Sequence, residues 1–257
     1  MYNMYFPHDM DATVAYVAPN AYGVEDIRHG KFLKKVAKAS DRKAILNFQK
    51  ELLKRKSRLM PLFNEYSNSK NYTYRLSNEE IFDYCVLEFS FAFWQWGARV
   101  SSIPTKKDSD QKLFYYLIGI ASPSYFAIED IEPTFPFFYQ AARELGYYAY
   151  DTKPLRKYLS IESAENYLHK IFLSEDMKVE YDPSTSERLT KFTQTTSNKI
   201  ALVYGEYDPW TAAEIDFGNN PNIVKILIPK ASHAGRIISL SKDKYDEYVS
   251  LIETWLK

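Results

Sequence analysis

The chain has 257 residues, of which 46% are hydrophobic and 26% charged, a globular composition that excludes a disordered chain. Lysine plus arginine equals aspartate plus glutamate at 33 each, and this neutral balance gives no electrostatic footprint for nucleic acid or an anionic membrane. The single cysteine, Cys85, excludes an intrachain disulfide, and no apolar run reaches the roughly 18 residues of a membrane span.

The first predicted elements are the tail of an apolar helix at residues 1–6 and a buried strand at 12–19, a β-branched and alanine run that ends at proline. The character of the chain changes from about 25 to 195, where charged stretches dominate. Apolar residues at helical spacing, from Ile45 to Leu53, predict an amphipathic helix or helix pair there. We find no clear strand signal in this long span.

A further helix is predicted to start at a capping box, Ser77 to Glu80, and to end at Gly97. Because this helix is apolar nearly all round, we expect it to be buried or to line a pocket. Shorter helices are predicted at 135–148 and 160–173.

Strand signals return at 199–205 and 222–229, and an amphipathic helix at 241–257 closes the chain. The order is therefore strand, long helical insertion, strand, strand, helix. This order predicts an α/β fold with a parallel sheet and a helical lid inserted between two strands.

Two polar residues follow the predicted strands directly. Asp208 comes after the strand at 199–205 and His233 after the strand at 222–229, and the carboxyl ends of adjacent parallel strands meet where such sheets bind ligands. An aspartate there can accept the Nδ1 proton of a histidine, which then serves as general base toward a nucleophile. The alternative is that Asp208-Pro209 is an ordinary turn and His233 a surface histidine.

The nucleophile is harder to find. An α/β hydrolase presents its serine on a Gly-x-Ser-x-Gly turn, but no two of the eight glycines lie four residues apart. Ser232 shares a loop with His233, and the serines of 121–126 lie inside the helical insertion, so we expect none of these to be the nucleophile. The sequence has no metal-ligand spacing and no phosphate-binding glycine loop, so we expect neither metal nor cofactor.

Six segments of the chain resemble the C-terminal part of serine peptidase family 37, the secreted bacterial tripeptidyl and prolyl-tripeptidyl aminopeptidases. They are FPHDMDATVAYVAPN, EDIRHGKFL, VLEFSFAFWQWG, PFFYQAARELGYYAYD, YGEYDPWTAA and SHAGRI. The most specific are VAYVAP with EDIR, and FAFWQWG. The resemblance implies the C-terminal part of an α/β-hydrolase sheet, formed by 1–24 and 190–257, with a large helical cap, 25–189, inserted between two strands.

The resemblance also implies a Ser-Asp-His triad in which Asp208 is the acid and His233 the base. The family's serine stands on a Ser-Lys-Gly-Gly elbow that would lie upstream of Met1. We therefore expect a fragment of a serine exopeptidase that releases short peptides from free N-termini. The alternative is a catalytically dead remnant or a non-enzymatic binding or scaffold protein.

The fragment interpretation has consequences for partners and location. Without a neighbouring strand, the apolar strand at 12–18 would be an exposed sheet edge, so we expect the missing N-terminal part to be a partner besides the peptide substrate. The parent protein is expected to be exported, although this N-terminus has no signal peptide and the chain as written would be cytoplasmic.

Substrate recognition by an aminopeptidase needs an acceptor for the free amine and apolar walls. The candidate acceptors are three carboxylates, Glu25, Asp26 and Glu88. The candidate walls are three indoles that could stack on a proline-sized ring, Trp94, Trp96 and Trp210. The alternatives are a structural partner within the cap for Glu88, and plain core packing for Trp94 and Trp96.

Overall fold

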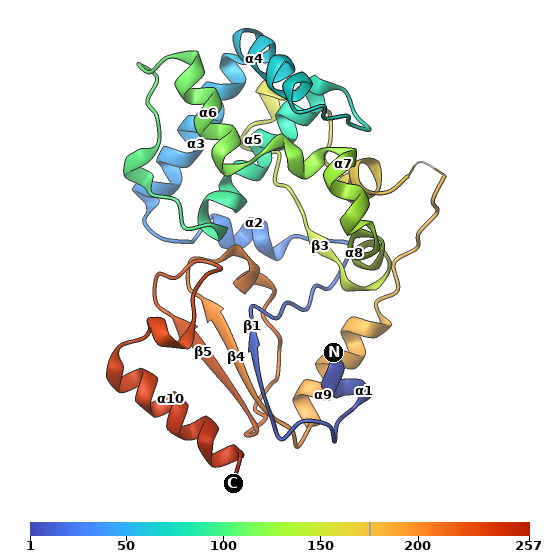
Figure 1. Cartoon of the computed structure of the whole chain (residues 1–257), viewed down its shortest axis with the longest axis vertical. Helices are drawn as coiled ribbons and strands as arrows, with labels where there is room; N and C mark the ends of the chain where they lie inside the picture. Colours follow the sequence, from blue (N-terminus) through green and yellow to red (C-terminus); the bar gives the residue numbers. More distant parts are fainter. Residues whose placement is uncertain (175) are drawn as a thin grey trace.

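The computed structural model describes residues 1–174 and 176–257 and contains a three-stranded parallel sheet. Its strands, β1 (Ala12–Tyr16), β4 (Lys199–Gly205) and β5 (Ile223–Ile228), lie in the order β1-β4-β5. All carboxyl ends point toward a large assembly of helices (Figure 1). The expected α/β class and parallel sheet are therefore confirmed.

The burial of β4 fits its central position in the sheet. β4 is buried on both faces from Ile200 to Gly205, as a central parallel strand should be. On one face packs the C-terminal helix α10 (Lys242–Trp255), and on the other lie α9 (Ser184–Thr195) and the short α1 (Tyr2–Tyr5) (Figure 1). The three predicted strands and the C-terminal helix are thus found within a few residues of their expected bounds.

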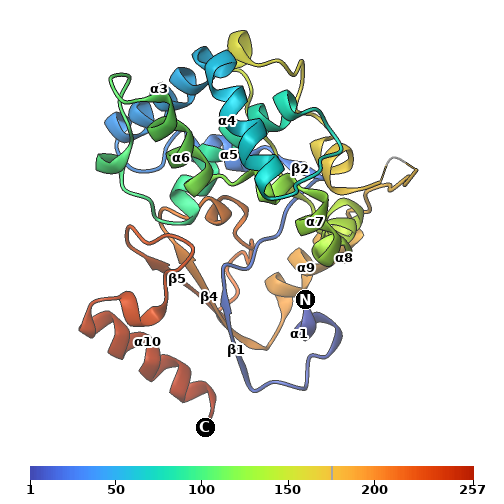
Figure 2. The same ribbon diagram turned by 45° about the horizontal axis from the view of Figure 1, so that its top comes forward.

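The helical layer, residues 28–172, lies beyond the carboxyl ends of the strands in both ribbon views (Figure 2). Its α-helices are α2 (Arg28–Leu33), α3 (Ala39–Lys54), α4 (Lys56–Ser69), α5 (Asn78–Gln95), α6 (Asp110–Ile120), α7 (Ile128–Ile131) and α8 (Phe135–Gln140). The predicted helix pair is confirmed as α3 and α4.

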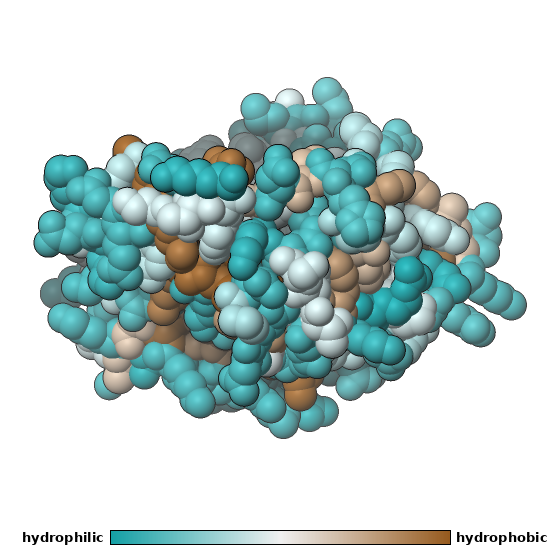
Figure 3. Space-filling model, turned by 90° about the horizontal axis from the view of Figure 1, so that it is seen from below, coloured by the Kyte–Doolittle hydropathy of each residue, from teal (hydrophilic) through white to brown (hydrophobic). Residues whose placement is uncertain are grey.

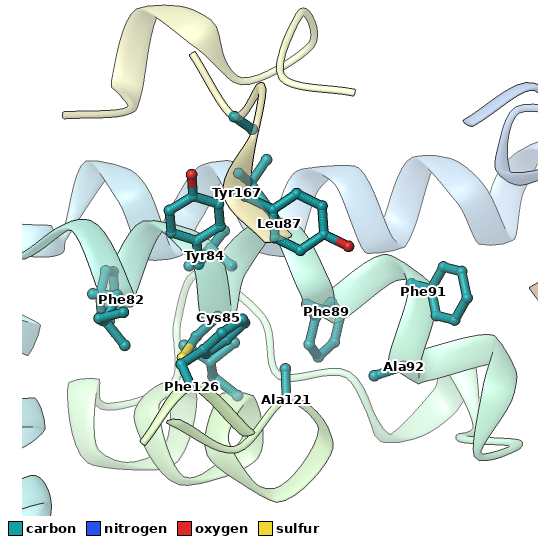
Figure 4. Packing of buried hydrophobic residues seen from close by; sticks show 14 of the residues in the cluster. Phe82, Tyr84, Cys85, Leu87, Phe89, Phe91, Ala92, Ala121, Phe126 and Tyr167 are labelled. Atoms are coloured by element: carbon teal, nitrogen blue, oxygen red, sulfur yellow. The ribbon is translucent and has the colours of Figure 1, made fainter. Parts of the chain in front are cut away.

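Helix α5 is the centre of this layer. The predicted capping box is present, because the Ser77 hydroxyl accepts the Glu80 amide and the Glu80 carboxylate accepts the Ser77 amide. Side chains on all sides of α5 are buried among the surrounding elements (Figure 4). Phe91 and Ala92 leave the helix in different directions, so neighbouring positions on α5 face different surroundings.

Two predictions for the helical layer are wrong. Residues 160–173 form only one π-helical turn, η6 (Leu168–Phe172), because Asn166 adopts the left-handed φ of 60° and breaks the helix before it. The predicted helix at 135–148 ends at Leu145, because Tyr147–Tyr148 form strand β3, which pairs in parallel with β2 (Glu25–Asp26). Strands of two residues are too short to produce the alternating pattern that identifies a strand.

Strand β1 forms one edge of the three-stranded sheet. Val14 and Tyr16 on this strand are 37% and 39% exposed, so the edge is both unpaired among the described residues and partly apolar. Seen from the sheet end of the molecule, apolar side chains form brown patches among hydrophilic ones (Figure 3). Within the described part of the chain, no helix has the length and apolarity needed to span a membrane.

Candidate active site

Asp208 lies at the carboxyl end of β4, where it forms the N-cap of the short helix η7 (Pro209–Ala213). Its side chain is fully buried, and its Oδ1 atom accepts the Trp210 amide at 3.2 Å. Its Oδ2 atom lies 2.9 Å from Nδ1 of His233. Since a carboxylate can only accept, Nδ1 of the imidazole carries the proton in this hydrogen bond.

The loop after β5 presents His233 to solvent on its other side. The side chain is 34% exposed, and within residues 1–174 and 176–257 no hydrogen-bond partner contacts its Nε2 atom. With the proton fixed on Nδ1, the Nε2 lone pair is available to accept a proton from an approaching group.

Gly205 allows this loop to pack against the end of β4. A Cβ atom at Gly205 would lie 2.5 Å from the carbonyl oxygens of both Ala231 and Ser232, closer than real atoms approach. The absence of a side chain is therefore a condition for the short distance between Asp208 and His233.

A cavity of about 360 Å³ lies between α5 and η7, beside this pair. Three residues of α5 at helical spacing, Glu88, Ala92 and Gln95, line one wall together with the C-cap residue Trp96. The cavity extends toward the loop after β5 at Trp96, whose ring centroid lies 6.0 Å from that of His233. Trp96 is 64% exposed, so it stands at the mouth of the cavity.

Glu88 lies at the other end of the cavity wall and is buried. Its Oε2 atom accepts hydrogen bonds from Tyr148 at 2.9 Å and Tyr150 at 2.8 Å. Burial raises the pKa of Glu88 to about 7, although the two tyrosine hydroxyls oppose that shift. No cationic side chain among the described residues pairs with this carboxylate, so it can receive a cationic ligand group.

Aromatic rings form much of the remaining cavity wall, which also contains Ile120, Ala121 and Ser122. The hydroxyl of Tyr125 lies 2.9 Å from that of Tyr147 and 3.2 Å from that of Tyr148, which continues the hydrogen-bond chain to Glu88. Trp210 packs edge-on against the rings of Tyr147 and Tyr148, with centroid distances of 5.3 and 5.6 Å. These tyrosines had no sequence signal, because the chain contains 22 of them without distinctive spacing.

The structure places three other candidates away from this cavity. Asp26 forms an ion pair with Arg28; burial alone would raise its pKa, but hydrogen bonds from Arg28 and Tyr22 lower it. Glu25 lines a separate cavity of about 550 Å³. Trp94 lines a third, of about 310 Å³, and packs edge-on against Tyr207. Glu88, Trp96 and Trp210 are thus the candidates that the fold brings together.

His29 is a buried residue of α2 next to the cavity wall. Its Nδ1 lies 3.2 Å from the Asp26 carbonyl oxygen, while its buried Nε2 has no partner among the described residues. Its ring packs against Trp210 with a centroid distance of 5.5 Å. Burial lowers the pKa of His29, which favours the neutral imidazole in this contact with Trp210.

The chain is similar to known proteins over nearly its whole length. Residues 1–256 match the model of the family described as PS-10 peptidase S37. A curated relative, a prolyl tri/tetrapeptidyl aminopeptidase from Streptomyces mobaraensis, is 23% identical over 265 residues, which cover 99% of this chain and 54% of the relative. The chain therefore spans about half the length of that relative. No solved structure matches.

Proposed function

Because this chain belongs to the PS-10 peptidase S37 family, we propose that it carries the acid–base pair and the substrate cavity of a serine exopeptidase that releases short peptides from free N-termini. The observation that carries this proposal is the 2.9 Å contact between Asp208 Oδ2 and His233 Nδ1, at the carboxyl ends of neighbouring parallel strands. A non-enzymatic scaffold is not favoured, because the matched family and the relative are both peptidases.

In the proposed mechanism His233 is the general base. Its exposed Nε2 takes the proton of a serine hydroxyl as that oxygen attacks the peptide carbonyl, and Asp208 stabilises the resulting imidazolium through Nδ1. The imidazolium then gives its proton to the leaving amine. The buried Asp208, which accepts one hydrogen bond at each carboxylate oxygen, holds the imidazole in the one tautomer that can perform both transfers.

The serine itself is proposed to come from a part of the protein outside these 257 residues. Ser122 lines the cavity, but its hydroxyl donates to Ser124 at 3.0 Å, and no contact couples it to His233. In an α/β-hydrolase arrangement the strand that bears the nucleophile would pair with the free edge of β1, and the helical layer would act as the cap. The exposed Val14 and Tyr16 on β1 support this pairing.

Glu88 is the proposed acceptor for the free amine of the substrate. Its carboxylate is buried and lacks a cationic partner among the described residues, and it lies in the same cavity as Trp96 and Trp210. An ammonium group would supply the missing positive charge, and the indoles would contact the apolar side chains of the peptide. The name of the relative, a tri/tetrapeptidyl aminopeptidase, supports a short peptide as product.

The test uses the full-length protein and an activity-based fluorophosphonate probe. We expect labelling that His233→Ala abolishes, together with cleavage of a tripeptide anilide that has a free amine. If the full-length protein neither reacts nor cleaves, the proposed function is wrong. Labelling of the 257-residue chain by itself would place the nucleophile within it.

Export of the full-length protein is also proposed, on the resemblance to a secreted family. Cell fractionation of the native host tests this location. Recovery of the peptidase from the cytoplasm alone would contradict it.

A further inference from the structure

Helix α5 carries both ends of the proposed substrate cavity. Glu88 lies at the buried end. Gln95 lies at the end next to the loop after β5 that carries the proposed general base His233 (the catalytic loop), and its carbonyl oxygen accepts the His233 amide at 3.0 Å. Between them Ala92 lines the same wall, one helical turn after Glu88. The cavity therefore follows one stripe of a single continuous helix.

We propose that α5 fixes the length of the released peptide, because it sets the distance between the substrate amine bound at Glu88 and the catalytic loop. We call this role of α5 a ruler, and Glu88, from which the residues are counted, its zero mark. This inference rests on the proposed function of Glu88 as amine acceptor. Gln95 lies seven positions after Glu88, and at about 1.5 Å per residue this corresponds to roughly 10 Å of helix. An extended peptide advances about 3.3 Å per residue, so roughly three residues fit between the bound amine and the catalytic loop.

A helix that sets peptide length has to be rigid, and both Glu88 and the end of α5 at Gln95 are held in place. The helix is fixed at its start by the Ser77–Glu80 capping box and is buried along nearly its whole length. Hydrogen bonds from two tyrosine hydroxyls hold the Glu88 carboxylate in one position. The hydrogen bond from the His233 amide to the Gln95 carbonyl oxygen links the catalytic loop directly to the end of α5.

The position of Ala92 allows the zero mark to be moved. The double variant Glu88→Gln/Ala92→Glu places a carboxylate four residues closer to His233, a displacement of about 6 Å along the helix. That distance corresponds to nearly two residues of extended peptide. We expect the main product to shorten by one or two residues, as measured by mass spectrometry on a set of unblocked peptides.

The matched control keeps the charge on α5 but outside the cavity. Ser90 is half-buried and lines a different cavity, so Glu88→Gln/Ser90→Glu restores a carboxylate that cannot meet the substrate amine. We expect this control to behave like Glu88→Gln alone. In both variants the amine is no longer anchored, and the products should spread over several lengths.

The outcomes separate the ruler from the proposed function. Shortened products from the Ala92→Glu variant support the ruler. An active wild type whose product length stays the same in every variant overturns the ruler and leaves the peptidase intact, whereas an inactive wild type overturns both. If the Ala92→Glu variant does not fold, as judged by circular dichroism, the single variant Glu88→Gln decides: a spread of lengths supports the ruler and one unchanged length contradicts it.

Discussion

The backbone amide of His233 donates a hydrogen bond to the carbonyl oxygen of Gln95, 3.0 Å away. This contact joins the loop after β5 to the last turn of α5, so the sheet and the helical layer meet at the proposed general base. Residues that are distant in the sequence therefore act on one site, and substitutions on either side of the contact give separable predictions.

Removal of the acid–base pair should abolish turnover without unfolding the protein. In the full-length enzyme, Asp208→Asn takes away the acceptor that sets the His233 tautomer, and kcat should fall by about 10³- to 10⁴-fold. His233→Ala should have a similar effect. The matched control is Asp243→Asn on the exposed surface of α10, which should retain wild-type kcat. Equal activity of Asp208→Asn and the control would contradict the assigned role.

Loss of the Glu88 charge should weaken binding of unblocked peptides in particular. A charge-assisted hydrogen bond contributes about 1.5–3 kcal/mol, so Glu88→Gln should raise KM for a free-amine substrate about 10- to 100-fold. The N-acetylated form of the same peptide serves as the control, because it has no ammonium group. A similar rise in KM for both substrates would exclude Glu88 as the amine acceptor.

The preference for free amines should depend on pH. Burial raises the pKa of Glu88 to about 7, so the carboxylate becomes charged only as pH rises through that value. The substrate amine loses its proton near pH 8. The ratio of kcat/KM for free-amine over blocked peptides should therefore rise between pH 6 and 7.5 in the wild type. In Glu88→Gln the ratio should be flat, and a persisting rise would point to another group.

The same carboxylate should reduce stability at neutral and alkaline pH. The folded protein holds the Glu88 proton more tightly than the unfolded chain does, so its contribution is lost as pH rises from about 4.5 to about 7. Two and a half pKa units correspond to about 3 kcal/mol. Urea unfolding at pH 8 should show Glu88→Gln to be more stable than the wild type by up to that amount. At pH 4.5 the difference should largely vanish.

His29 should make the protein sensitive to acid. Burial lowers its pKa, so the unfolded chain binds a proton that the folded state refuses, and stability falls as pH drops below about 6.5. The free energy of unfolding should therefore decrease between pH 7.5 and 5.5. His29→Phe should remove this part of the pH dependence in urea titrations, whereas His8→Phe at an exposed site should not.

The sequence predicted the parts of the fold that have long, regular patterns. The strands β4 and β5 and the helix α5 each have a continuous apolar signal, and the capping box marks the start of α5. Asp208 and His233 could be paired because each directly follows a strand. The prediction failed at 160–173, where the left-handed Asn166 interrupts an apparently helical pattern.

The hydrogen-bond partners within the cavity could not be predicted in the same way. Tyr148 and Tyr150 lie some sixty residues after Glu88, and tertiary contacts such as the pairing of β2 with β3 and the stacking of Tyr148 on Phe91 bring that segment to α5. Such short pairings leave no periodicity in the sequence. Glu88, Glu25 and Asp26 are all acidic residues beside apolar ones, so the sequence alone does not distinguish them. Only the tertiary structure places Glu88 in the cavity and the other two outside it.

The exposed position of Trp96 provides a fluorescence signal for peptide binding. An indole in contact with water emits at longer wavelength than a buried one, and Trp96 is 64% exposed at the mouth of the cavity whereas Trp94, two residues before it, is only 6% exposed. A peptide that covers the mouth would remove water from Trp96, so the intrinsic emission should shift to the blue in proportion to occupancy. The molecule thus contains its own fluorophore for binding titrations that need neither turnover nor a nucleophile.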